Sequence, residues 1–199
     1  MNPHRDSSVT IGIDISQKHA PTAIAVVERE TRPGTDSHFL VRHLQRLPLN
    51  TPYPQVARRL AQVCDRVREI QGHWPEIFVD ATGVGTPVVD QLRADSRIAS
   101  YVWAVYLTHG NRRTERPAER RITLGKASLV SRLQALLQGQ RLCFPATAEA
   151  QALGRELANY EIRVTENATD RYGAFRVGTH DDLATALGLA VHKPARSDR

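Results

Sequence analysis

Apolar and polar residues alternate without interruption from Val9 to Ser16. A period of two is typical of a β-strand, and it puts Asp14 on the face opposite Ile11 and Ile13. Aspartate is depleted in strands, and nothing about a central strand requires a carboxylate. Asp14 therefore indicates that this strand carries part of a functional site as well as part of a hydrophobic core.

The segments that follow predict further strands and a long helix. Strands are expected at 22–27 and 39–44, and the short joins, one marked by Pro33-Gly34, favour antiparallel hairpins. An amphipathic helix is expected from Tyr53 to Gln71, ended by Gly72. Its apolar residues are spaced by three or four positions: Val56, Leu60, Val63, Val67 and Ile70.

The rest of the chain predicts alternating helices and strands. The expected elements are a strand at 77–79 that ends on Asp80, a helix at 87–93, an apolar strand at 101–107, a helix at 123–138, a strand at 142–144, a helix at 147–160, a hairpin at 170–173 and a helix from Asp181. This order predicts an α/β fold with a mixed sheet of five or more strands. A three-strand antiparallel meander would join parallel strands, with helices on both faces.

With 199 residues, the chain is long enough for one well-buried core. We expect a single domain over residues 9–193, between a disordered leader at 1–8 and a disordered tail at 194–199. No stretch reaches the ~20 apolar residues of a membrane span, and MNPHRDSSVT lacks the apolar core of a signal peptide. Cys64 and Cys143 form no Cys-x-x-Cys motif. A cytoplasmic protein with no membrane partner is expected.

Acidic residues stand where the expected strands and helices begin or end. Asp80 closes a strand, and Asp181 and Asp182 open the last helix. Carboxylates are the ligands that Mg2+ and Mn2+ prefer. Two-metal cleavage of a phosphodiester needs a bridging carboxylate on a rigid element, which suits Asp14, and flanking carboxylates, which suit the other three. The set predicts a site for two ions and hydrolysis by a metal-activated water that attacks in line.

Each flanking acid also has a structural explanation. Asp80, placed before Thr82-Gly83, could form a turn, and Asp181-Asp182 could cap a helix. The two helix residues are about 100° apart around the axis, so one should be the firm ligand and the other an auxiliary or water-mediated one. The sequence leaves that assignment open. His180 could assist a proton transfer or only contribute to the start of the helix.

The densest basic stretch of the chain consists of Arg112, Arg113, Arg116, Arg120, Arg121 and Lys126. A formal net charge of +6 is compatible with a polyanionic partner. We expect an exposed loop that contacts DNA phosphates, with Lys126 the preferred contact; the alternative is a solvated charged loop. Arg171, expected at the tip of the 170–173 hairpin, is a second candidate contact.

Three segments occur in order along the chain: G-I-D-I-S, V-D-A-T-G-V-G-T-P-V-V-D-Q-L and H-D-D-L-A-T-A-L-G-L-A. Together they resemble the nuclease domain of phage terminase large subunits, within the ribonuclease H-like superfamily that includes RuvC-type Holliday junction resolvases. The resemblance spans residues 9–192, and H-D-D-L is its most specific part. It implies that Asp14, Asp80, Asp181 and Asp182 are the metal-binding acids of an endonuclease. It also implies DNA cleavage with Mg2+ or Mn2+ during packaging, in a bacterial cell or a phage-infected host.

Terminase large subunits also carry an ATPase motor with a G-x-x-x-x-G-K-[ST] loop. The Gly125-Lys126 pair has Arg120 in place of the first glycine and Ala127 in the last position, so this loop is absent here. The expected form is a nuclease domain separated from its motor, or a stand-alone relative. DNA is the expected partner, together with a separate ATPase motor or packaging components.

Three alternatives stay open. A RuvC-like resolvase would use the same acids on a branched junction. An ATP-binding domain of the actin and sugar-kinase kind also uses G-x-D and D-x-x-G-x-G-T, although such proteins need two domains and 199 residues cannot supply both. A non-catalytic nucleic-acid-binding module would gain nothing from carboxylates that repel phosphate.

Overall fold

The computed structural model describes residues 6–16, 20–31, 34, 36–83, 85–96, 98, 101–158, 161–164, 170–173 and 181–193. Its strands are β1 (Asp6–Asp14), β2 (Ala23–Thr31), β3 (His38–Arg46), β4 (Glu76–Asp80), β5 (Val102–Thr108), β6 (Arg113–Arg116), β7 (Arg121–Gly125), β8 (Leu142–Cys143), β9 (Glu161–Val164) and β10 (Asp170–Gly173). Its helices are α1 (Tyr53–Gln71), α2 (Gly85–Arg93), the 3-10 helix η2 (Pro117–Glu119), α3 (Lys126–Gln138), α4 (Ala148–Ala158) and α5 (Asp182–Val191).

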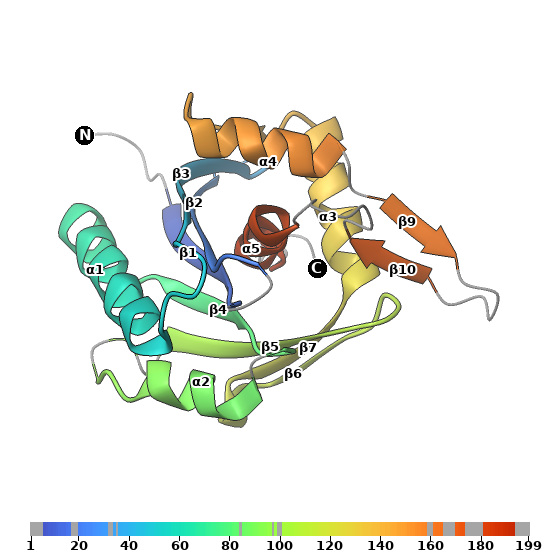
Figure 1. Cartoon of the computed structure of the whole chain (residues 1–199). Coiled ribbons are helices and arrows are strands. Elements are labelled where there is room, and N and C mark those ends of the chain that lie inside the picture. Colours follow the sequence, from blue (N-terminus) through green and yellow to red (C-terminus); the bar gives the residue numbers. More distant parts are fainter. Residues whose placement is uncertain are drawn as a thin grey trace, which may run out of the picture.

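The main sheet has eight strands in the order β6-β7-β5-β4-β1-β2-β3-β8 (Figure 1). β1, β2 and β3 form the expected antiparallel meander. On the other side of β1, β4, β5 and β7 follow in parallel. The predicted mixed sheet is therefore confirmed, and it is larger than the minimum of five strands.

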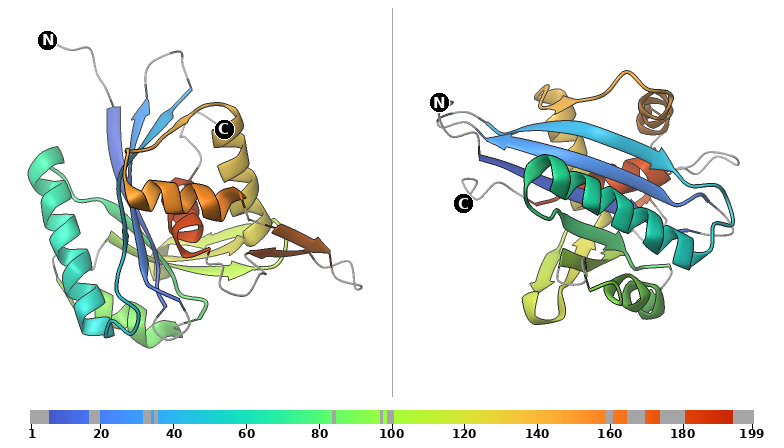
Figure 2. Two further views of the ribbon diagram at one scale, coloured as in Figure 1. Left: turned by 45° about the horizontal axis from the view of Figure 1, so that its top comes forward. Right: turned by 90° about the vertical axis from the view of Figure 1, so that its left-hand side faces the viewer.

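Helices cover both faces of the sheet, as predicted (Figures 1 and 2). α1 and α2 pack on one face, where Ile11, Ile13 and Leu60 belong to one buried cluster. α3, α4 and α5 pack on the other face, where Leu129 and Leu187 belong to a second cluster. The sheet is thus buried on both sides, and functional groups can reach solvent only at its edges and strand ends.

Helix α1 has the predicted bounds. Its C-terminal residue is followed by Gly72, whose φ of 77° is readily adopted by glycine. The apolar positions Val56, Leu60, Val63 and Val67 are buried, while Ile70 in the last turn is 64% exposed.

The close approach of α5 to β1 depends on Gly12. A Cβ atom on Gly12 would overlap the backbone carbonyl of Ala186 and lie 2.6 Å from the amide nitrogen of Ala190. The hydroxyl of Thr10 donates a hydrogen bond of 2.7 Å to the carbonyl of Ala190. Thr10 and Gly12 therefore face the helix, and Asp14, two residues further on the same face, lies toward its beginning.

The basic stretch at 112–126 is not the loop that its charges predicted. Residues 113–125 form β6, η2 and β7, and β7 pairs with β5 in parallel and with β6 in antiparallel orientation. Ile122 and Leu124 are buried, so a short alternation specifies a strand that the surrounding arginines masked in the sequence. α3 consequently begins at Lys126 instead of residue 123.

Other boundaries differ as well. Residues 6–8, expected in a disordered leader, belong to β1 and pair with β2 from Asp6 opposite Thr31 onward. Arg171 lies within β10, opposite Arg163 of β9, and not at a hairpin tip. The remaining leader residues and the tail lie outside the described residues. Within the segments that the structure describes, no helix combines the length and apolar character needed to cross a membrane.

Candidate metal centre

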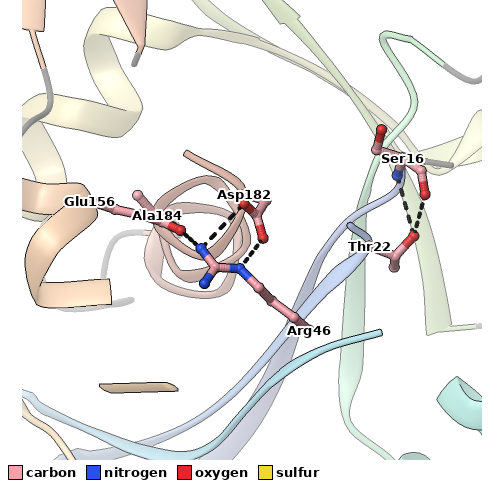
Figure 3. A network of polar contacts seen from close by, with 6 residues as sticks. All are labelled: Ser16, Thr22, Arg46, Glu156, Asp182 and Ala184. Carbon is pink, nitrogen blue, oxygen red and sulfur yellow. Dashed lines mark hydrogen bonds and ion pairs between the residues drawn. The ribbon is translucent and has the colours of Figure 1, made fainter. Parts of the chain in front are cut away.

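Asp14 and Asp80 are the last residues of two neighbouring parallel strands and pair in register. Asp14 has a paired strand on each side, because it also pairs with Ala23 of β2. Just beyond Asp14, the hydroxyl of Thr22 donates to the carbonyl of Ser16 at 2.7 Å and accepts its N–H at 3.3 Å (Figure 3). The two acids predicted on separate strands thus meet at one edge of the sheet.

The Asp14 carboxyl lies in a negatively charged environment. Burial raises its pKa well above the ordinary value, and the negative charges of Asp80, Asp181 and Asp182 raise it further. The positive charge of Lys126 acts in the opposite direction. The structure therefore brings the other three predicted acids within electrostatic influence of Asp14, which their separation in the sequence did not guarantee.

Asp80 forms the turn that its sequence context suggested. Its Oδ1 accepts the N–H of Thr82 at 2.8 Å, and the Thr82 hydroxyl oxygen in turn accepts the N–H of Leu107 at 2.7 Å. Burial raises the pKa of the Asp80 carboxyl, while the hydrogen bonds from Thr82 lower it. The turn contact orients the carboxylate and ties it to β5, so a turn and a ligand role are compatible.

Asp181 occupies the N-cap position of α5, but its side chain makes no capping hydrogen bond. Its Oδ2 instead lies 3.5 Å from Nζ of Lys126, the first residue of α3. Simple helix capping therefore does not account for the Asp181 carboxylate.

Asp182 has a different environment. It is 1% exposed, and Nε of Arg46 donates to its Oδ2 at 2.7 Å. The same guanidinium pairs with Glu156 of α4, whose Oε2 accepts the N–H of Ala184 at 2.8 Å (Figure 3). The two adjacent aspartates thus point to different partners, as their angular separation around the helix predicted.

The donor chemistry of this edge fits a hard divalent cation. Asp14, Asp80 and Asp181 offer only oxygen atoms, and their mutual repulsion favours a bound positive charge. Among the residues that the structure describes, no three His, Cys, Asp or Glu side chains are grouped so that they could hold a metal ion as they stand. What the fold provides for a cation is the oxygen-only donor set and its negative charge.

We call residues 112–126 the basic hairpin. Arg112, Arg113, Arg116 and Arg121 are exposed, and Arg120 is half-buried. Several are held by neighbours: Arg113 pairs with Glu115 at 2.6 Å, Arg116 with Glu119 at 3.4 Å, and the Arg121 guanidinium lies 4.3 Å from the centre of the Tyr106 ring. The contact of Lys126 with Asp181 joins the hairpin to the acids. His180 and the side chain of Arg171 lie outside the described residues.

Sequence reasoning missed Arg46 and Glu156. Arg46 lies two residues beyond the strand expected at 39–44, and Glu156 lies in a helix to which no functional residue was assigned. Glu156 is 7% exposed, although glutamate is rarely buried. A single sequence holds no signal for such a pair, because the residues they contact are distant along the chain.

A family model described as the terminase RNaseH-like domain matches residues 11–193. No curated protein sequence matches this chain.

Solved terminase structures are similar to this chain. The large terminase nuclease from thermophilic phage G20c has a TM-score of 0.65 and 20% identity over 96% of this chain and 84% of that one. The g2p (large terminase) nuclease domain from bacteriophage SPP1, with bound Mn, has a TM-score of 0.53 and 13% identity over 92% and 84%. The HK97 bacteriophage large terminase has a TM-score of 0.55 and 14% identity over 96% of this chain and 40% of that one. At these identities the likeness shows a shared fold.

Proposed function

The chain belongs to the terminase RNaseH-like domain family, and from that premise we propose that it is a metal-dependent DNA endonuclease. The observation that carries the proposal is the in-register pair of Asp14 and Asp80 at the ends of parallel strands, with Asp181 contributed from the start of α5. A cluster of partly buried like charges destabilises a fold unless it serves a ligand. Turn formation or helix capping could explain Asp80 or Asp181 singly. Neither explains why these acids and Asp14 lie near one another.

Each acid has a proposed role. Asp14, between β2 and β4, is the central ligand that two ions would share, and Asp80 and Asp181 are the flanking ligands. Asp182, held by Arg46, is the auxiliary member of the pair. A bound Mg2+ or Mn2+ supplies Lewis acidity toward the phosphate and lowers the pKa of a bound water. His180 remains a proposed auxiliary group.

Two relatives support the choice of cation. The G20c nuclease has been solved with bound magnesium, and that structure has a TM-score of 0.64 and 19% identity over 94% of this chain and 82% of that one. The SPP1 nuclease domain was solved with bound Mn. Oxygen-only donors select these same ions on chemical grounds. We therefore propose two Mg2+ or Mn2+ ions as the cofactors.

The basic hairpin is the proposed DNA contact. Its exposed arginines can bind phosphates without reading sequence, and Lys126 stands where the hairpin reaches the acids. Arg171 is proposed as a further contact from β10. DNA and packaging components, including an ATPase motor, are the proposed partners, in the cytoplasm of a bacterial or phage-infected cell.

A plasmid nicking assay with Mn2+ tests the activity. The unaltered chain should convert supercoiled plasmid to open circles, and Asp14→Asn should not. Asp90→Asn, which removes an exposed aspartate from α2, is the matched control and should cut normally. Full cutting by Asp14→Asn would refute the proposed site.

Further assays on the same protein distinguish the alternative functions. Cleavage of linear duplex and plasmid is expected, while cleavage confined to four-way junctions would favour a resolvase. A rise in melting temperature with ATP would favour a kinase-like domain. DNA binding without cutting under any metal would favour a non-catalytic module.

A further inference from the structure

The first turn of α5 is capped from another helix. Helix N-termini leave backbone N–H groups without partners inside the helix, and an N-cap aspartate usually accepts one of them. Here Asp181 makes no such bond, and Glu156 of α4 accepts the N–H of Ala184 instead. A buried side chain from a distant segment therefore does the work that the local N-cap residue would otherwise do.

Arg46 pairs with carboxylates of both helices. Its side chain is 28% exposed, while those of Asp182 and Glu156 are 2% and 6% exposed. One guanidinium thus serves two buried carboxylates, one on α5 and one on α4 (Figure 3). Its planar fork is suited to this geometry, and a lysine would not reproduce it.

We propose that Arg46 and Glu156 are positioning residues for the metal site, which take over capping and charge balance at the start of α5 and leave the Asp181 carboxylate available to a divalent cation. The inference rests on the proposed function. Outer-shell groups that fix the orientation of a ligand commonly change metal affinity by about 10–100-fold when they are removed.

The arrangement assigns separate tasks to two adjacent aspartates. Asp182 anchors α5 to the end of β3 through Arg46, and Asp181, one residue earlier, projects toward Lys126. If Arg46 is lost, the Asp182 carboxylate loses its positive partner and the first turn of α5 loses an anchor. Asp181 is then held less well, even though no ligand has been altered.

Mn2+ binding in the absence of DNA, measured by titration calorimetry, tests this role. Arg46→Gln should weaken Mn2+ binding by about tenfold or more. Arg42→Gln removes an exposed arginine of the same strand that pairs with Glu28, and it should bind Mn2+ like the unaltered chain. Leu60→Ala opens a cavity on the opposite face of the sheet, and it should lower the melting temperature without changing Mn2+ affinity.

The outcomes distinguish the inference from the function on which it rests. Unchanged Mn2+ affinity in Arg46→Gln, beside a loss in Asp14→Asn, overturns the positioning role alone. No Mn2+ binding by the unaltered chain overturns both. Should Arg46→Gln fail to fold, Arg46→Lys decides: it keeps the charge without the fork, so affinity several-fold weaker than normal supports the role and normal affinity overturns it.

Discussion

Asp14 and Asp80 stand side by side because β1 and β4 run parallel and end at the same level of the sheet. Parallel pairing places the carboxyl ends of both strands at one edge, and the register leaves no offset between the two acids. Their negative charges therefore repel each other at a partly buried position, and a bound cation would relieve the repulsion. The proposed site can therefore be tested by its effect on the stability of the chain as well as by its proposed activity.

Asp14→Asn should flatten the pH dependence of stability of the metal-free chain. The pKa of the Asp14 carboxyl is raised above its ordinary value of 3.8, first by burial and then by the charge of Asp80. Between 3.8 and that raised pKa the folded chain holds more protons than the unfolded chain, so the free energy of unfolding falls as the pH rises through this window. The asparagine does not ionise, so the variant should be more stable than the unaltered chain at neutral pH. Urea unfolding in EDTA across this range measures the difference, and parallel pH curves would contradict it.

The same variant should lose its thermal response to Mn2+. A ligand that binds only the folded state raises the melting temperature. The unaltered chain and the Asp90→Asn control should both show this rise, and Asp14→Asn should show little or none. An equal rise in all three proteins would place Mn2+ binding elsewhere.

Much of this fold is predictable because its signals are local. The alternation around Ile11 and Ile13 specifies β1, and the spacing of apolar residues with Gly72 behind it specifies α1. Asp14 is conspicuous because aspartate is depleted in strands, and Asp80 is conspicuous because it closes a strand. A carboxylate at the end of a parallel strand is visible in the sequence as soon as the order of elements is known.

Other features depend on contacts that no local pattern contains. The division of Asp181 from Asp182 is set by Lys126 and Arg46, which come from different elements. The strand β7 was obscured because only Ile122 and Leu124 turn inward, and the arginines at 112, 113, 116, 120 and 121 lie before or at its start. Tertiary pairing with β5 determines its conformation, and a window along the chain cannot detect that pairing.

Gly12→Ala should destabilise the chain and impair Mn2+ binding together. The added methyl would overlap the Ala186 carbonyl, so β1 and α5 must move apart. Overpacking of this kind typically costs roughly 1–3 kcal/mol, and it also displaces the aspartates at the start of α5. Gly83→Ala is the control, because a Cβ there meets nothing within 4 Å. Urea unfolding and calorimetry report the two effects, and normal stability of Gly12→Ala would contradict the packing described here.

Removing charge from the basic hairpin should reduce the salt dependence of DNA binding. Each phosphate contact contributes about 0.9 to the slope of log affinity against log salt. Arg116→Gln with Arg120→Gln should therefore lower the slope by up to about 1.8. Arg58→Gln with Arg66→Gln removes the same charge from α1 and serves as the control. Fluorescence anisotropy with duplex DNA measures both, and equal slopes in the two double variants would exclude a specific role for the hairpin.

His192, at the end of α5, should make the chain less stable in weak acid. Burial lowers the pKa of its imidazole from 6.5 to about 4, against a raising effect of the hydrogen bond to the Leu189 carbonyl. Below pH 6.5 the unfolded chain takes up a proton that the folded chain does not, so the free energy of unfolding falls as the pH drops from 6.5 to about 4. This effect is greatest at the acid end, where it amounts to roughly 3 kcal/mol at most.

His192→Gln removes the titration and keeps a donor for Leu189, so its stability should change less over this pH range. The Asp14 effect has the opposite sign, and comparing each variant with the unaltered chain separates the two. His109→Gln replaces an exposed histidine and should keep the normal pH dependence. Urea unfolding at closely spaced pH values is the measurement. If His192→Gln loses as much stability in acid as the unaltered chain, a group other than this buried imidazole causes the loss.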